Sequence, residues 1–112
     1  MPNLTEEEEM IIEKYVLMPL AKKALDYDRQ VLEKSKLKFP QKYLKLNENT
    51  NISLQKEMSH VRKALLELKI RPIRKDSLHY EFVIRGHSHP VGFHPNIARD
   101  KINKWINEIL YD

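Results

Sequence analysis

Four of the five histidines in this sequence lie close together, at His79, His87, His89 and His94. Imidazole nitrogens bind metal ions and move protons near neutral pH, so this cluster is where the sequence could do chemistry. Side chains two residues apart on a strand share one face, and His87 and His89 could therefore hold one zinc ion. His94 or a carboxylate would be the third ligand and water the fourth, with Glu81 as the nearest candidate base.

The string His87-Ser88-His89-Pro90 resembles part of the signature of the JAMM metalloproteases. Asp100 falls where that signature has an aspartate, but apolar Ile97 stands where it has a serine. That fold also needs a large sheet and a glutamate on an earlier strand, whereas helices are predicted there. Short motifs recur by chance, and structural context is what confirms them. We therefore expect no catalytic residue and no cofactor, and keep zinc binding or zinc hydrolysis by His87, His89 and His94 as an alternative.

The composition suits one small domain, predicted to span residues 1–112. Hydrophobic residues make up 41% of the sequence. It contains no cysteine, so disulfides, thiolate zinc sites and cysteine nucleophiles are excluded. The start of the chain has an acidic run instead of the basic segment of a signal peptide. The apolar runs are too short to cross a bilayer. We expect a cytoplasmic protein that is not in a membrane.

The charge is distributed unevenly, although the net charge is only +4. The beginning is acidic, from Glu6 to Glu9 and at Glu13, whereas the middle is basic. A basic segment can attract nucleic acid. However, neither helix-turn-helix spacing nor interleaved aromatic residues accompany it. Nucleic-acid binding therefore remains an alternative, and its candidate residues are Arg62, Lys63, Lys69, Arg71, Arg74, Lys75 and Arg85.

The first predicted element is a helix from about residue 5 to residue 35, opened by the capping box Thr5 to Glu8. Pro19 lies within it and is expected to kink it. Its first half is apolar nearly all round, which requires cover on every side from other elements or from a second subunit. We therefore predict an interaction surface and a homodimer contact at Met10, Ile11, Ile12, Val16 and Met18.

The remaining elements follow from changes in apolar spacing. Pro40 opens a second helix, and although the polar tract 47–51 could be a loop, the stripe from Leu54 to Leu68 favours one continuous helix. The first two helices are expected to form an antiparallel helical hairpin over about residues 5–69. Alternation from Leu78 to Ile84 predicts one strand of a β-hairpin over about 70–86. A C-terminal helix over about 95–110 completes the chain.

Several segments resemble the YhjD-like proteins of Gram-positive bacteria and their phages. They are the string Tyr15-Val16-Leu17-Met18-Pro19-Leu20 within Met10 to Leu20, then Tyr80-Glu81-Phe82, Arg85-Gly86 and Phe93-His94-Pro95. The resemblance covers most of the chain and implies a compact cytosolic helical protein without a known activity. We predict a mainly helical α+β fold and a small non-enzymatic interaction or regulatory module, self-associating through the N-terminal helix.

Overall fold

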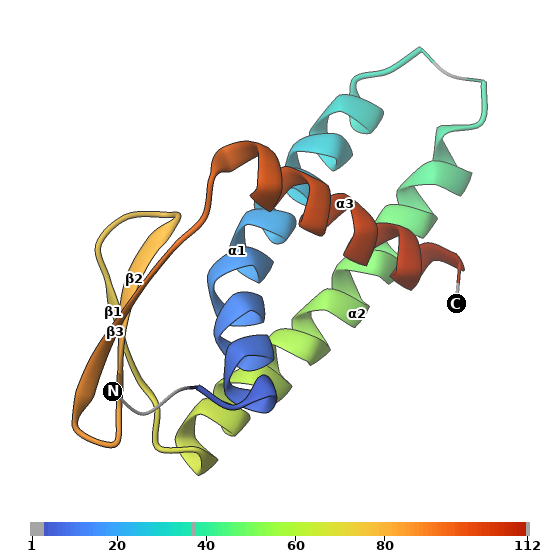
Figure 1. Cartoon of the computed structure of the whole chain (residues 1–112). Helices are drawn as coiled ribbons and strands as arrows, with labels where there is room; N and C mark the ends of the chain where they lie inside the picture. Colours follow the sequence, from blue (N-terminus) through green and yellow to red (C-terminus); the bar gives the residue numbers. More distant parts are fainter. Residues whose placement is uncertain (1–3, 37, 112) are drawn as a thin grey trace.

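Three helices and one antiparallel sheet make up the fold (Figure 1). The computed structural model describes residues 4–36 and 38–111. The elements are α1 (Glu6–Glu33), α2 (Pro40–Glu67), β1 (Arg71–Arg74), β2 (His79–Ile84), β3 (His87–Gly92) and α3 (Pro95–Tyr111). Helices α1 and α2 form a long hairpin, the sheet lies near the start of α1 and the end of α2, and α3 crosses the hairpin. The predicted mainly helical α+β fold is confirmed.

Helix α1 begins with the capping box that the sequence predicts. The Thr5 hydroxyl accepts a hydrogen bond from the Glu8 amide at 3.0 Å, and the Glu8 carboxylate accepts one from the Thr5 amide at 2.8 Å. Together these bonds satisfy two amide donors that a helix start otherwise leaves without partners. The helix then continues through Pro19 as one element (Figure 1).

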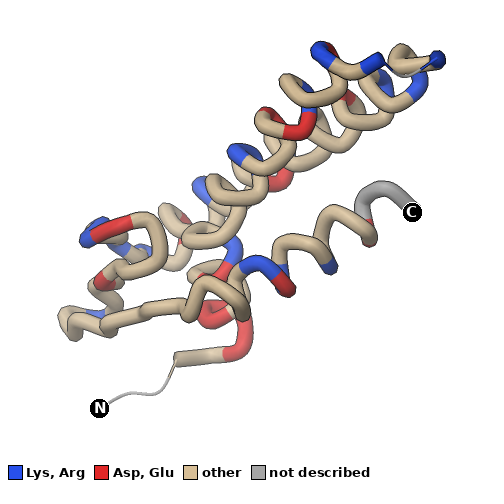
Figure 2. The backbone as a smooth tube through the Cα atoms, turned by 90° about the horizontal axis from the view of Figure 1, so that it is seen from above, with Lys and Arg blue, Asp and Glu red and all other residues tan. Residues whose placement is uncertain are grey.

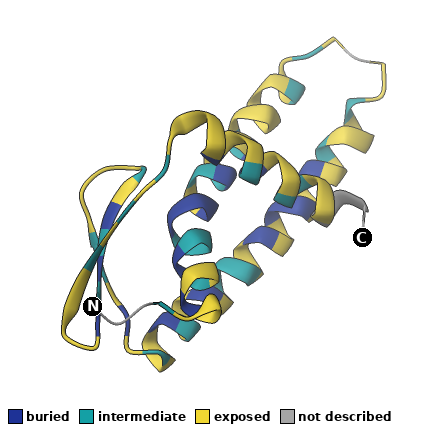
Figure 3. Ribbon diagram, viewed as in Figure 1, coloured by how far each residue is buried: buried dark blue, intermediate teal, exposed yellow. Residues whose placement is uncertain are grey.

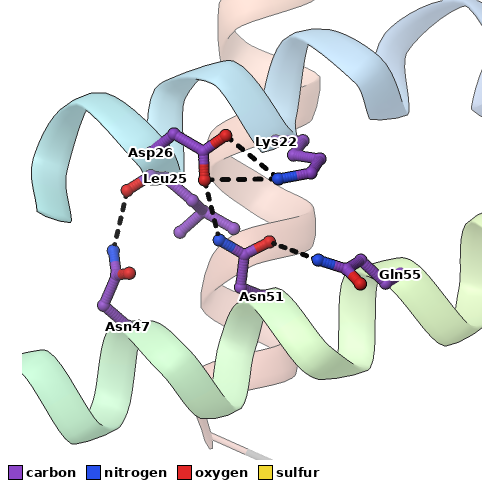
Figure 4. Close-up of polar contacts among 6 residues, drawn as sticks. All are labelled: Lys22, Leu25, Asp26, Asn47, Asn51 and Gln55. Atoms are coloured by element: carbon purple, nitrogen blue, oxygen red, sulfur yellow. Dashed lines mark hydrogen bonds and ion pairs between the residues drawn. The ribbon is translucent and has the colours of Figure 1, made fainter.

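Helix α2 is continuous through the polar tract 47–51, which resolves the choice between helix and loop. Asparagines are poor helix formers because their amides compete for backbone groups, but here these amides bond across to α1 (Figure 4). Asn47 Nδ2 donates to the Leu25 carbonyl at 2.9 Å, and Asn51 Nδ2 donates to Asp26 Oδ1 at 3.0 Å. These long-range bonds stabilise a stretch whose local preference for helix is weak.

The sheet has the order β1-β2-β3 with both neighbouring pairs antiparallel. Strand β2 buries Tyr80, Phe82 and Ile84, as its alternation predicts. The sequence prediction stopped at a two-stranded hairpin and assigned residues 87–92 to a loop, whereas they form β3. The turn between β2 and β3 is Arg85-Gly86, with φ of +51° and +76°, values typical of a tight two-residue hairpin. Pro90 fits because β3 is an edge strand.

The hydrophobic core lies where α1, the second half of α2, the sheet and the first half of α3 meet. It contains Ile12, Val16, Leu17, Met18, Ala21, Leu25, Leu54, Val61, Leu65, Ile70, Tyr80, Phe82, Ile84, Ala98 and Ile102. Within the described residues, no buried apolar side chain lies between Leu25 and Leu54. The free end of the hairpin therefore projects from the core, and the fold is elongated, measuring 57 × 24 × 19 Å (Figure 1).

Candidate interaction surface

The histidines do not assemble into a metal site. Because the turn at Arg85-Gly86 reverses the chain, His87 and His89 lie opposite Ile84 and Phe82, not on the face that carries His79. The predicted shared face depended on extension past Gly86, which the turn interrupts. In the described part of the chain, no three histidine or carboxylate side chains are placed to hold a metal ion. The geometry therefore lends no support to the metal alternative.

Two of these four histidines make local polar contacts. His79 Nδ1 lies 2.8 Å from Asp76 Oδ1 in the turn between β1 and β2. His94 Nδ1 accepts a hydrogen bond from the Asn96 amide at 3.2 Å, at the start of α3. His87 is exposed, and the buried Nε2 of His89 has no hydrogen-bond partner among the described residues. A single imidazole cannot by itself form a metal site.

The seven cations of the nucleic-acid alternative lie on several elements and do not form one stripe. Arg85 bonds the Glu8 carboxylate at 2.7 Å, and Lys75 lies 3.8 Å from Glu81. Arg71 and Arg74 fall on opposite faces of β1, because their positions differ by an odd number. The remaining three, Arg62, Lys63 and Lys69, lie in or just after the last turns of α2. This distribution does not provide the continuous basic face that a nucleic-acid backbone would need.

The predicted N-terminal interaction surface is mostly inside the fold. Ile12, Val16 and Met18 belong to the core, Ile11 is half-buried, and Met10 alone of the five is exposed. From the sequence, either other elements of the chain or a second subunit could cover this helix. The chain's own α2, sheet and α3 provide that cover, so this set of residues cannot form an open apolar surface.

The exposed apolar residues gather instead at the projecting end of the hairpin, residues 26–36 and 38–53, which we call the arm. Figure 3 colours the chain by exposure and shows that much of the arm is exposed. Six of the nine large apolar side chains that are exposed in the described residues lie there: Tyr27, Val31, Phe39, Tyr43, Leu46 and Ile52. Phe39, next to the connection between the helices, is 73% exposed. A concentration of exposed apolar residues in one part of a fold is typical of a contact site.

The buried residues of the arm are polar: Asn47, Thr50 and Asn51. Asp26 joins the two helices there, because its carboxylate accepts bonds from Lys22 and from Asn51 (Figure 4). The Lys22 hydrogen bond, followed by that of Asn51, lowers the pKa of Asp26. With amides and a carboxylate between its helices, the arm has little apolar interior in which its own hydrophobic side chains could be buried.

The arm is also basic. Its connection and adjoining helix ends carry Lys34, Lys36, Lys38, Lys42 and Lys45, and the sequence has no acidic residue between Glu33 and Glu48. Within the described residues none of these five lysines forms an ion pair. Figure 2 shows this concentration of positive residues at the free end of the hairpin.

An acidic groove lies near the start of α1, with a volume of about 330 Å³. We define the acidic groove by its lining residues, Glu6, Glu9, Met10, Glu13, Lys14 and Trp105. Lys101 bonds Glu13 at 2.9 Å and Glu57 bonds Lys14 at 2.9 Å, whereas Glu6 and Glu9 form no ion pair with a described residue. The groove thus combines free negative charge with the apolar side chains of Met10 and Trp105.

The fold and these two surfaces define a small, mainly helical α+β protein with a projecting helical hairpin. The chain belongs to the YhjD protein family, whose model matches residues 3–112. It is 32% identical over 115 residues to "Uncharacterized protein YhjD" of Bacillus subtilis (strain 168), covering 99% of this chain and 96% of that protein. No solved structure matches it. The resemblance stated from the sequence is confirmed, and none of the described helices is apolar enough to span a membrane.

Sequence reasoning missed both surfaces, although one signal was present. The acid-free interval from Lys34 to Lys45 contains Phe39 and Tyr43 among its lysines, a combination that favours an exposed contact over a core. The acidic groove had no comparable signal. Its glutamates are typical of the first turn of a helix, and Trp105 lies beside them only because α3 packs on α1.

Proposed function

We propose that this protein is a small non-enzymatic interaction module whose copies associate, the arm of one docking in the acidic groove of another. The observation that carries the proposal is the arm itself, a projecting pair of helix ends with exposed aromatic residues and five lysines that form no ion pair with a described residue. His79 lies on the opposite face of the sheet from His87 and His89, and no three histidine or carboxylate side chains of the described residues come together, which favours an interaction role over a catalytic one.

Apolar contact would supply much of the binding free energy. Phe39 and Tyr43 are large and exposed, and aromatic residues are prominent among the residues that dominate interface energetics. Met10 and Trp105 in the acidic groove offer a matching apolar surface. Docking would bury these side chains together and remove their contact with water, at roughly 25 cal/mol for each Å² of apolar surface.

Charge complementarity favours a second copy of this chain as the partner. Two arms packed against each other would bring ten lysines together, five from each copy, which is unfavourable. The acidic groove, in contrast, presents Glu6 and Glu9 without intramolecular partners among the described residues. Opposite charges on the two surfaces would steer the encounter and fix its register.

The proposal is tested by the mass of the protein in solution, measured by sedimentation or light scattering. At about 0.1 M salt and high protein concentration, we expect at least twice the mass of one chain, falling toward one chain near 0.5 M salt as screening weakens the charges. The double variant Phe39→Ser/Tyr43→Ser is expected to weaken association at least about 100-fold.

A matched control is Leu66→Ser, because Leu66 is 79% exposed on α2 but lies outside the arm. This variant should keep the mass of the unchanged protein. A single-chain mass for the unchanged protein at high concentration contradicts the proposal. So does equal loss of association in the control and in the double variant, since that would indicate a contact elsewhere.

A further inference from the structure

A second cavity, of about 170 Å³, lies between α1, α2 and β2. Tyr15 and Met18 line it from α1, Met58, Val61 and Arg62 from α2, and Tyr80 from β2. Apart from Lys14, which borders both, its lining differs from that of the acidic groove and includes no residue of the arm. Neither surface of the proposed association explains this cavity.

Tyr80 contributes a phenol to the lining of this cavity. Tyr80 is 8% exposed, lines the cavity, and makes no hydrogen bond to any described residue. Burial raises the pKa of Tyr80, so at neutral pH the hydroxyl is protonated and can donate. Tyr15 holds the ring in place through an edge-on contact with centroids 5.8 Å apart. The Tyr80 hydroxyl itself is not among the buried polar atoms of the described residues, so it reaches solvent at the cavity and can donate to water or to a ligand.

Arg62 is the cation of the cavity that remains available. It is exposed, lines the cavity, and forms no ion pair within the described residues, whereas Lys14 is bonded to Glu57 at 2.9 Å. A guanidinium and a phenol together are donors that fit a carboxylate. The rest of the lining, from Met18, Met58 and Val61, is apolar.

The volume limits the size of the ligand. An engineered apolar cavity of about 150 Å³ holds one benzene molecule, so a cavity of 170 Å³ has room for about one ring. From the donors, the apolar lining and this volume, we propose that the cavity binds a small carboxylic acid with a ring-sized apolar part. Its carboxylate lies at Arg62 and the Tyr80 hydroxyl, and its apolar part lies against Met18, Met58 and Val61.

Benzoate is a suitable probe, and benzamide is the uncharged molecule of the same shape. We expect saturable binding of benzoate to the full chain, with a dissociation constant on the order of 1 mM, followed by titration calorimetry or NMR shifts. Benzamide should bind at least about tenfold more weakly, because it lacks the charge that Arg62 recognises.

Arg62→Gln should weaken benzoate binding about tenfold and leave benzamide binding unchanged, because Arg62 is exposed and its loss removes only the ion pair. Arg99→Gln, at an exposed cation on α3 outside this cavity, is the matched control and should bind benzoate normally. Tyr80→Phe should also weaken benzoate binding, through the lost hydroxyl. The proposal is overturned if benzoate and benzamide bind with equal affinity, or if Arg62→Gln binds benzoate as tightly as the unchanged protein. It is also overturned if no saturable binding is seen at benzoate concentrations tenfold above the expected dissociation constant.

Discussion

Replacing Phe82 by alanine is expected to lower the free energy of unfolding by about 3–5 kcal/mol, the usual cost of removing a buried aromatic side chain. Phe82 is 0% exposed on the central strand. Its ring stacks on Tyr80 at 5.8 Å and meets the edge of Tyr15 at 6.0 Å, which joins the sheet to α1. The variant leaves a cavity where these elements meet, and the small core has few other contacts to compensate.

Urea unfolding followed by circular dichroism measures this effect. The matched control is Val83→Ala, because Val83 is the next residue on β2 and points to the half-buried opposite face. It should cost about 1 kcal/mol or less. If Phe82→Ala loses no more stability than Val83→Ala, the strand does not present its even-numbered residues to the helices and the described core is wrong.

Glu8→Gln is expected to destabilise the protein by about 2–3 kcal/mol at pH 7, because it weakens the ion pair of a buried carboxylate and the capping box at once. The Glu8 side chain is 4% exposed and bonds Arg85 at 2.7 Å, whereas Arg85 is 47% exposed, which moderates the loss. This pair fastens the start of α1 to the turn between β2 and β3, where Arg85 adopts a left-handed backbone conformation.

The same pair makes stability depend on pH in a defined direction. The Arg85 hydrogen bond and then the Thr5 amide lower the pKa of Glu8 in the folded protein. A carboxylate whose pKa is lowered in the folded protein stabilises the fold at pH values above its unfolded-state pKa of about 4.3. This stabilisation is lost as the pH falls through the folded-state pKa.

The difference in free energy of unfolding between the unchanged protein and Glu8→Gln should therefore be largest near pH 7 and decrease below about pH 4. Unfolding measured across that pH range tests the effect. Glu7→Gln is the control, since Glu7 is exposed, lies outside the acidic groove and forms no ion pair with a described residue, and its difference should stay within about 0.5 kcal/mol. A Glu8→Gln difference that is the same at pH 7 and pH 3 would show that the charge of Glu8 is not responsible.

The parts of the fold that could be predicted are mostly those specified by local sequence patterns. The capping box at Thr5, the three-four stripe from Leu54 to Leu65 and the alternation of Tyr80, Phe82 and Ile84 each need only neighbouring residues, and each was predicted correctly. Strand β3 was missed because its local signals point elsewhere. Its Pro90 disfavours a strand, and the turn before it begins with Arg85, where asparagine or glycine is usual. The strand is stabilised instead by its pairing to β2.

The candidate surfaces depended on long-range packing and could not be read from spacing. Tyr27 and Val31 continue the same helical period as buried Leu17 and Ala21, but they are exposed because they lie on the arm, beyond the core. Helical periodicity shows which residues share a face, not whether another element covers that face. Conversely, the apolar start of α1 was predicted to need a partner, and the chain itself provides most of the cover.

The central claim, that an arm of one copy docks in the acidic groove of another, is tested most directly by charge reversal. One variant carries Glu6→Lys and Glu9→Lys, and the other carries Lys38→Glu and Lys42→Glu, with folding of each checked by circular dichroism. In each variant alone, arm and groove have the same sign of charge and should repel. In an equal mixture, each arm meets a groove of opposite charge in the other variant.

The decisive measurement is the mass of each variant and of their mixture by sedimentation at about 0.1 M salt, where surface charges are only partly screened. We predict the mass of one chain for each variant alone and at least twice that mass for the mixture. If either variant alone associates as the unchanged protein does, or if the mixture stays at the mass of one chain, the arm and the acidic groove are not partners.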